Sequence, residues 1–139
     1  MSFQEKRAWI YAAVAVVVPL AYAVTLLARA PRTGLAAGGY VVPLLIAVGA
    51  SIVLNVTAET VAAGLAPREA RTRDERDRAI GRRGEHAAFY VMSIAALVPL
   101  VLAMREAPYF WIANALYLSF ALAAVVSSVV KIVAYRRGM

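Results

Sequence analysis

The sequence predicts an all-α integral membrane protein, a four-helix bundle of two antiparallel transmembrane hairpins with both termini cytoplasmic. Four uncharged segments separate the charged parts of the chain, and a helix of about 20 residues spans the roughly 30 Å of bilayer hydrocarbon. The segments cover residues 8–28, 33–58, 87–104 and 107–130. Because they take up most of the 139 residues, 63% of which are hydrophobic, we expect residues 1–139 to form a single transmembrane domain.

The basic residues predict the orientation. Twelve of the fifteen lie before the first segment, between the second and third, or after the fourth, which leaves only Arg29, Arg32 and Arg105 in the other two connections. Cytoplasmic connections of membrane proteins carry an excess of Lys and Arg. We therefore expect a multi-pass protein of a prokaryotic inner (cytoplasmic) membrane, with the N and C termini and the central connection in the cytoplasm.

The first helix is expected at about residues 7–28. A signal peptide is the alternative, since Ala28, Arg29 and Ala30 imitate a cleavage site, but the apolar run exceeds the 7 to 15 residues of a signal core. Pro31 just after that site should hinder cleavage as well. We therefore interpret this segment as a membrane helix.

The other helices follow in order. The second ends before Pro67, since proline cannot continue a helix. The fourth starts with an aromatic belt of Tyr109, Phe110 and Trp111, as is usual at a membrane interface. Short connections make each hairpin antiparallel. The expected helices cover about residues 40–64, 86–104 and 109–135.

Between the hairpins, residues 65–85 form a charged cytoplasmic linker. Opposite charges recur at a spacing of four residues, as in Asp74 and Arg78, and each such pair supports a solvated helix by about 0.2 to 0.5 kcal/mol. Further pairs are Glu69 with Arg73, Arg71 with Glu75, and Arg73 with Asp77. We expect Gly81 and Gly84 to loosen the chain before the third helix. We expect the linker to contact a protein partner or anionic lipid headgroups, which attract each basic residue by roughly 1 kcal/mol.

Polar residues in the helices gather toward the cytoplasmic side and predict an intramembrane cluster. One interpretation is that Glu59 pairs with Lys131 or exchanges a proton with His86, since ionisable groups at membrane depth need partners. The other is that Glu59 and Lys131 lie at the headgroup boundary, where lysine snorkels. The second is favoured because both residues bound their uncharged segments. The candidate cluster consists of Asn55, Glu59, His86, Tyr90, Ser128 and Lys131.

Several kinds of chemistry are excluded by composition. The chain has no cysteine, and His86 is its only histidine, so thiolate sites and multi-histidine metal sites are impossible. No nucleophile elbow or phosphate-binding glycine loop occurs. We expect the neighbouring arginines, rather than a metal ion, to pair with the carboxylates of Asp74, Glu75 and Asp77. We expect no enzyme activity, no cofactor and no metal. We interpret the net charge of +7 as the result of basic residues that set the orientation in the membrane, and we expect no binding to nucleic acid.

The run Asp74, Glu75, Arg76 and Asp77, followed by a second basic stretch and an apolar helix, resembles a family of small uncharacterised prokaryotic four-helix membrane proteins. Those proteins carry a cytoplasmic Asp-Glu-Arg-Asp-type motif between two transmembrane hairpins. The resemblance implies an accessory or regulatory role rather than an enzymatic one. It makes these four residues the candidate site for contact with a partner or lipid.

Two functions are therefore expected. The first is a non-enzymatic accessory, regulatory or immunity-type protein of the inner membrane, with a membrane or cytoplasmic protein partner. The alternative is a small oligomeric transporter or channel that uses the polar cluster. Ser119, Ala123 and Ser127 form a small face that serves close helix packing, either inside the bundle or in a homodimer.

Overall fold

The computed structural model describes residues 2–33, 39–68 and 74–138, and these ranges contain helices and no β-strand. Four stretches are long and apolar enough to cross a membrane: Phe3–Arg29, Val41–Leu65, Glu75–Met104 and Tyr109–Arg136. This part of the fold prediction is confirmed. The helices are α1 (Phe3–Thr33), α2 (Val41–Leu65), α4 (Glu75–Ala95), α5 (Leu97–Met104) and α6 (Tyr109–Arg136).

Two helices start earlier than predicted, and a polar side chain caps each start. The backbone N–H of Glu5 donates to Ser2 Oγ over 3.1 Å at the start of α1. The backbone N–H of Asp77 donates to Asp74 Oδ1 over 2.8 Å at the start of α4. Such caps satisfy amide groups that have no partner within the helix. Helix α4 therefore begins at Glu75, well before residue 86.

The expectation that two glycines loosen the chain before the third helix is wrong. Helix α4 continues without a break through Gly81 and Gly84, and both are buried together with Ile80. Glycine disfavours a helix by about 1 kcal/mol, which tertiary packing readily outweighs. The second half of the expected linker is therefore part of a helix that packs against α6.

The third span is interrupted at Ala96, where α4 ends and α5 begins. Pro99 lies four residues after Ala95 and has no N–H, so the carbonyl of Ala95 loses its helical hydrogen bond. Pro43 does not interrupt α2, because it lies in the first turn, where amide groups have no helical partner in any case.

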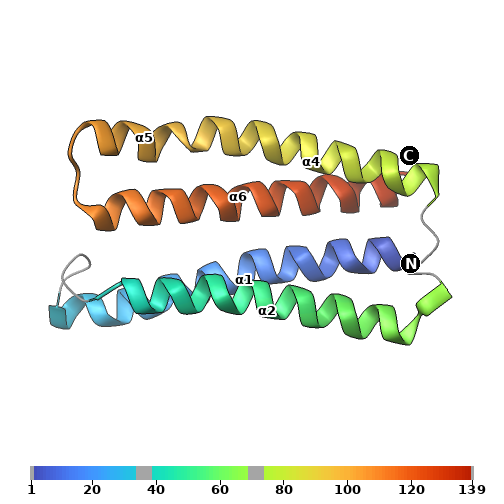
Figure 1. Ribbon diagram of the computed structural model, residues 1–139, viewed down its shortest axis with the longest axis horizontal. Helices are drawn as coiled ribbons and strands as arrows, with labels where there is room; N and C mark the ends of the chain where they lie inside the picture. The colour runs from blue at the N-terminus through green and yellow to red at the C-terminus, as the bar shows by residue number, and fades with distance from the viewer. Residues whose placement is uncertain (1, 34–38, 69–73, 139) are drawn as a thin grey trace.

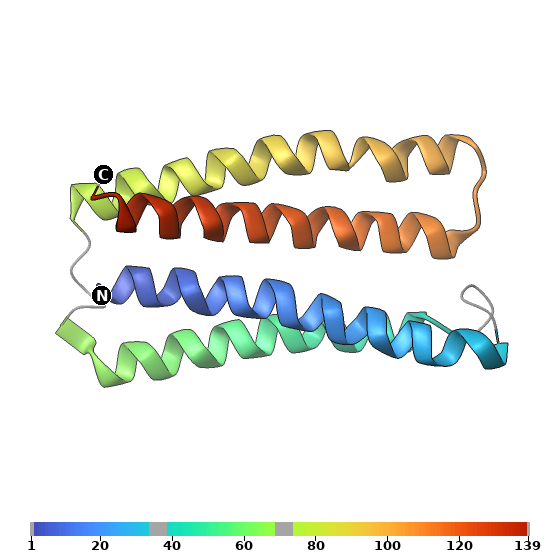
Figure 2. The same cartoon turned by 180° about the vertical axis from the view of Figure 1, so that it is seen from behind.

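The helices follow one another across the molecule in the order α4 with α5, then α6, then α1, then α2 (Figures 1 and 2). Among the described residues, α2 packs extensively on α1 alone, while α6 packs on α1, α4 and α5. The arrangement is therefore more open than a closed bundle. Helix α6 is the most enclosed helix. In its most apolar 18-residue stretch 22% is buried, against 6% in the corresponding stretch of α2.

Both termini lie at the same end of the molecule, together with the end of α2 and the start of α4 (Figure 1). We call it the terminal end. At the opposite end, the ring of Phe110 packs edge-on against Tyr40 with centroids 5.1 Å apart. Most large apolar side chains along the helices are exposed, as expected for surfaces that face lipid.

Candidate functional site

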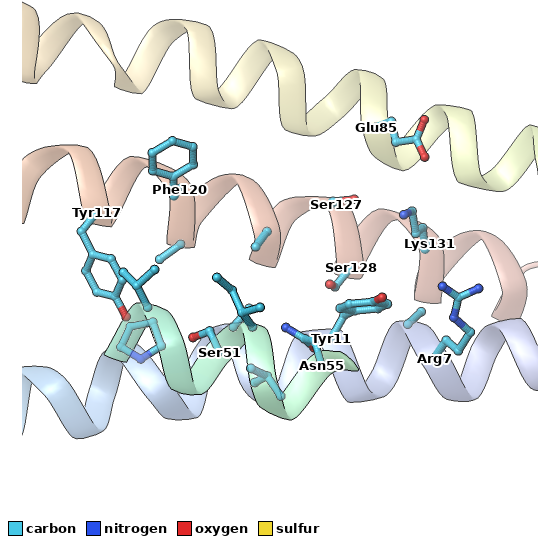
Figure 3. A pocket seen from close by; sticks show the side chains of 18 residues that line it. Arg7, Tyr11, Ser51, Asn55, Glu85, Tyr117, Phe120, Ser127, Ser128 and Lys131 are labelled. Atoms are coloured by element: carbon cyan, nitrogen blue, oxygen red, sulfur yellow. The ribbon is translucent and has the colours of Figure 1, made fainter. Parts of the chain in front are cut away.

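A groove of about 670 Å³ lies between α1, α2 and α6 in the terminal half of the molecule (Figure 3). We call it the α1–α2–α6 groove. It exists because α2 packs on α1 but not extensively on α6, so the space beside α1 stays open. Glu85 of α4 adds a carboxylate at its terminal end.

Charged side chains line the terminal end of the groove, and Arg7 bonds to two neighbouring side chains. Its Nη2 forms an ion pair with Glu59 Oε1, and its Nη1 donates to Gln4 Oε1 over 3.1 Å. The hydroxyl of Tyr11 donates to Glu59 Oε2 over 2.8 Å. The structure thus pairs Glu59 with Arg7 and Tyr11, two partners that the polar-cluster hypothesis did not name.

Lys131 lies beside Arg7 at this end, and its stem rests on Gly84 of α4. A Cβ atom added to Gly84 would lie 2.5 Å from Lys131 Cε and 2.7 Å from Cγ. A glycine is therefore required if the lysine is to keep this position. That contact explains why Gly84 occurs inside a helix.

Hydroxyl and amide groups follow next along the groove, from Tyr11, Asn55, Ser127 and Ser128. Asn55 Oδ1 is buried and accepts no hydrogen bond within the described part of the chain. The hydroxyl of Tyr117, further along the groove, is also buried and has no hydrogen-bond partner within the described part of the chain. A buried polar atom without a partner costs about 1 to 3 kcal/mol, so a ligand or water that bonds to these atoms would be favoured.

The far part of the groove is mainly apolar. Its apolar lining comes from Val14, Ala15 and Pro19 of α1, Val48 and Ile52 of α2, and Phe120, Ala121 and Ala124 of α6. At about 1.5 Å per residue, the groove extends roughly 21 Å along α6 from Lys131 to Tyr117. From Lys131 to Tyr117 the lining therefore changes from charged to hydrogen-bonding and then to mainly apolar, with the hydroxyls of Ser51 and Tyr117 in the far part.

The structure brings part of the predicted polar cluster together. Asn55, Ser128 and Lys131 line the groove, and Glu59 adjoins it through Arg7. His86 and Tyr90 do not line the groove, and both are exposed on α4. At about 100° per residue they lie roughly 200° and 240° around that helix from Gly84, which faces α6.

The Asp-Glu-Arg-Asp motif lies at the start of α4, where most of it contacts the chain itself. Asp74 caps the helix. The hydroxyl of Tyr135 donates to Asp77 Oδ1 over 2.8 Å, while Arg76 Nη2 donates to the carbonyl oxygen of Tyr135 over 3.3 Å. Glu75 is exposed. The motif thus fastens the start of α4 to the end of α6.

The expected charge pairs that involve Glu69, Arg71 and Arg73 lie outside the described residues. Among the rest, no group of three or more His, Cys, Asp or Glu side chains is arranged to hold a metal ion.

Sequence reasoning missed a buried contact between the two halves of the molecule. The hydroxyl of Tyr22 donates to Asn114 Oδ1 over 2.5 Å, and Asn114 Nδ2 donates to the carbonyl oxygen of Phe110 over 2.8 Å. The rings of Tyr22 and Tyr117 meet edge-on with centroids 5.3 Å apart. The available signal was the amide of Asn114 in the apolar first half of α6.

Comparison of the chain with protein families, with curated proteins and with solved structures finds no match in any of the three.

Proposed function

We propose that this chain is a non-enzymatic accessory protein of the inner membrane that holds one phospholipid of the cytoplasmic leaflet in the α1–α2–α6 groove. The order of side chains along the groove carries the proposal. Charged groups come first, then hydroxyl and amide groups, then a mainly apolar stretch that also holds the hydroxyls of Ser51 and Tyr117. A phospholipid has the same order of headgroup, glycerol esters and acyl chain.

The proposed topology puts the terminal end in the cytoplasm. The distribution of basic residues supports this, since twelve of fifteen belong to the termini and the central connection. The four apolar helices then cross the membrane as two antiparallel hairpins. In this orientation Arg7 and Lys131 lie at the level of the cytoplasmic headgroups, which is where a lipid phosphate would be.

The length of the groove fits a lipid that lies in one leaflet of the bilayer. Half of a bilayer of about 30 Å is roughly 15 Å, which the 21 Å from Lys131 to Tyr117 accommodates together with a headgroup. A volume of about 670 Å³ is in the range for sites that hold small molecules.

The test is to count lipids that remain on the purified protein. We expect native mass spectrometry in mild detergent to show one phospholipid per chain. Ala124→Phe, which adds a ring to the apolar part of the groove, should remove it. Ala23→Phe, on the exposed surface of α1, is the matched control and should retain it. Equal lipid retention by both variants would contradict the proposal.

The proposed topology has its own test, which the absence of cysteine makes straightforward. A single cysteine at Arg105 should react with a membrane-impermeant maleimide on intact spheroplasts. A single cysteine at Gly138 should react only after permeabilisation. The opposite labelling pattern would reverse the orientation.

The linker motif is the proposed contact with a protein partner. Glu75 is exposed and available, whereas Arg76 and Asp77 bond to Tyr135. We expect a Glu75→Lys variant to insert normally and to lose crosslinks to a partner. An unchanged crosslinking profile would limit the motif to its contacts within the chain.

A second candidate function is a small oligomeric transporter or channel. The buried, unpartnered Asn55 Oδ1 and Tyr117 hydroxyl favour it, because water could serve these atoms as well as a lipid does. This function predicts that Glu59→Gln abolishes proton or solute flux in reconstituted vesicles. Normal flux in that variant would remove its main support.

A further inference from the structure

Two hydroxyl groups lie in the far, mainly apolar part of the α1–α2–α6 groove. They belong to Ser51 of α2 and Tyr117 of α6, and both side chains line the groove. Figure 3 shows them at the end of the groove away from Arg7. A ligand that fills the far part of the groove therefore meets two hydroxyls as well as hydrocarbon.

These two hydroxyls differ from others in the membrane helices. Ser93 and Ser119 each donate to the carbonyl oxygen four residues earlier, over 2.7 and 2.8 Å, which satisfies a serine within its own helix. Within residues 2–33, 39–68 and 74–138, Ser51 forms no such bond, and the buried Tyr117 hydroxyl has no partner. Each hydroxyl can both donate and accept, so both have hydrogen-bonding capacity left for a ligand.

The depth of the two hydroxyls separates them from bulk water. At about 1.5 Å per residue, Ser51 lies roughly 12 Å along α2 from Glu59, which pairs with Arg7 at the charged end of the groove. In the proposed topology that end is level with the headgroups, and one leaflet has about 15 Å of hydrocarbon. Polar groups at this depth are satisfied by protein, by a ligand or by trapped water. The acyl chain of an ordinary phospholipid has no group that bonds to them.

We infer that the groove prefers a phospholipid whose acyl chain has a hydroxyl group near its middle, where it bonds to Ser51 and Tyr117. The inference rests on the proposed function and names the class of lipid. An extended chain advances roughly 1.3 Å per carbon, given carbon–carbon bonds of about 1.5 Å. A depth of roughly 12 Å then corresponds to about the ninth or tenth carbon of the chain.

Trapped water is the competing partner for the two hydroxyls. Water would serve them equally well with any acyl chain in the groove, so it predicts no preference among chains. A hydroxyl on the chain close to the headgroup would lie near the charged end and would not reach Ser51 or Tyr117. The position of the hydroxyl along the chain therefore distinguishes the two explanations.

The experiment is a lipid competition on the full-length protein. Three phosphatidylethanolamines are used that differ in one chain, which is octadecanoyl, 10-hydroxyoctadecanoyl or 2-hydroxyoctadecanoyl. The protein is delipidated in mild detergent and offered the plain lipid with an equal amount of one hydroxylated lipid, and the bound lipid is identified by native mass spectrometry. We expect about a fivefold preference for the 10-hydroxy lipid, as one net hydrogen bond provides, and none for the 2-hydroxy lipid.

A pair of double variants makes the result specific to the two hydroxyls. Ser51→Ala combined with Tyr117→Phe removes both oxygens and keeps the ring that packs on Tyr22. The ratio should then fall to about one while one lipid per chain remains bound. Ser93→Ala combined with Tyr109→Phe makes the same two substitutions at exposed residues that do not line the groove, and it should leave the preference unchanged.

The outcomes separate this inference from the proposed function. If one lipid binds per chain but the unmodified protein shows no preference, or prefers both hydroxylated lipids equally, the chain inference is refuted and the lipid-binding function stands. The same holds if Ser51→Ala with Tyr117→Phe keeps the preference. If the protein retains no lipid, or Ala124→Phe retains as much as the unmodified protein, the lipid-binding function is refuted and the chain inference falls with it.

Discussion

Replacing Gly84 with alanine tests the close approach of α4 and α6. Alanine favours a helix over glycine by about 0.5 to 1 kcal/mol, so the substitution should stabilise the protein if space allows. Here the new Cβ atom would lie 2.5 Å from Lys131 Cε and 2.7 Å from Cγ. Such overpacking typically costs about 1 to 3 kcal/mol, although the flexible lysine stem keeps the cost toward the lower end.

Gly81 provides the matched control, since it is three residues away on the same helix. A Cβ atom added there would have no atom within 4 Å beyond its own helix backbone and chain neighbours. Gly81→Ala should therefore gain the full helix preference. We expect Gly84→Ala to be less stable than Gly81→Ala by about 1 to 3 kcal/mol.

The assay is reversible unfolding in mixed micelles, followed by circular dichroism as the fraction of dodecyl sulfate rises. Adding Lys131→Ala to Gly84→Ala should remove the penalty, because the lysine stem is then absent; this double-mutant cycle isolates the contact. A Gly84→Ala protein as stable as Gly81→Ala would refute the reasoning.

Three other variants follow from single contacts. Tyr135→Phe removes the hydroxyl that donates to Asp77 and should lower the free energy of unfolding in the same assay by about 1 kcal/mol. Tyr22→Phe removes the hydrogen bond to Asn114, and between membrane helices such bonds are worth about 0.6 kcal/mol and at most about 1.7 kcal/mol. Glu59→Gln removes the ion pair with Arg7, but the Glu59 side chain is 43% exposed, so screening should keep the loss below about 1 kcal/mol in the same assay.

The controls for these variants use exposed residues of the same type. Tyr109 is 84% exposed, and Tyr109→Phe should leave stability unchanged. Glu75→Gln is the control for Glu59→Gln, since Glu75 is exposed, and it should leave stability unchanged. If either tyrosine variant unfolds like Tyr109→Phe, the corresponding hydrogen bond contributes nothing measurable. A loss of several kcal/mol in Glu59→Gln would contradict the screening argument.

The four spans were predictable because a long uncharged segment has few structures open to it other than a helix. The ends of the helices were harder to predict, since a helix that leaves the apolar region continues for as long as polar caps and packing support it. Asp74 and the buried Ile80 show why α4 reaches back to Glu75. The sequence does contain capping residues, Ser2 for α1 and Asp74 for α4, and Glu5 follows in the first turn of α1. A prediction based on the length of uncharged segments does not use these residues.

The side-chain pairs depended on the order of the helices, which hydropathy does not reveal. Helices α2 and α4 lie on opposite sides of α1 and α6 (Figures 1 and 2), so Glu59 and His86 belong to helices that do not pack extensively on each other. Arg7 was a reasonable partner for Glu59 from register alone, because an antiparallel hairpin places the start of α1 opposite the end of α2. Helix order had to be known before Lys131 could be placed beside Arg7 in one groove.

The edge position of α2 also affects how the protein opens. Within the described ranges, helix α2 has one extensive interface, with α1, whereas α6 packs on α1, α4 and α5. Parts of a protein with few packed contacts open at a lower free energy than the whole. Helix α2 is thus the element that separates most readily, and since it forms one wall of the groove, its separation from α1 is the simplest way to admit or release a molecule from the groove without unfolding the other helices.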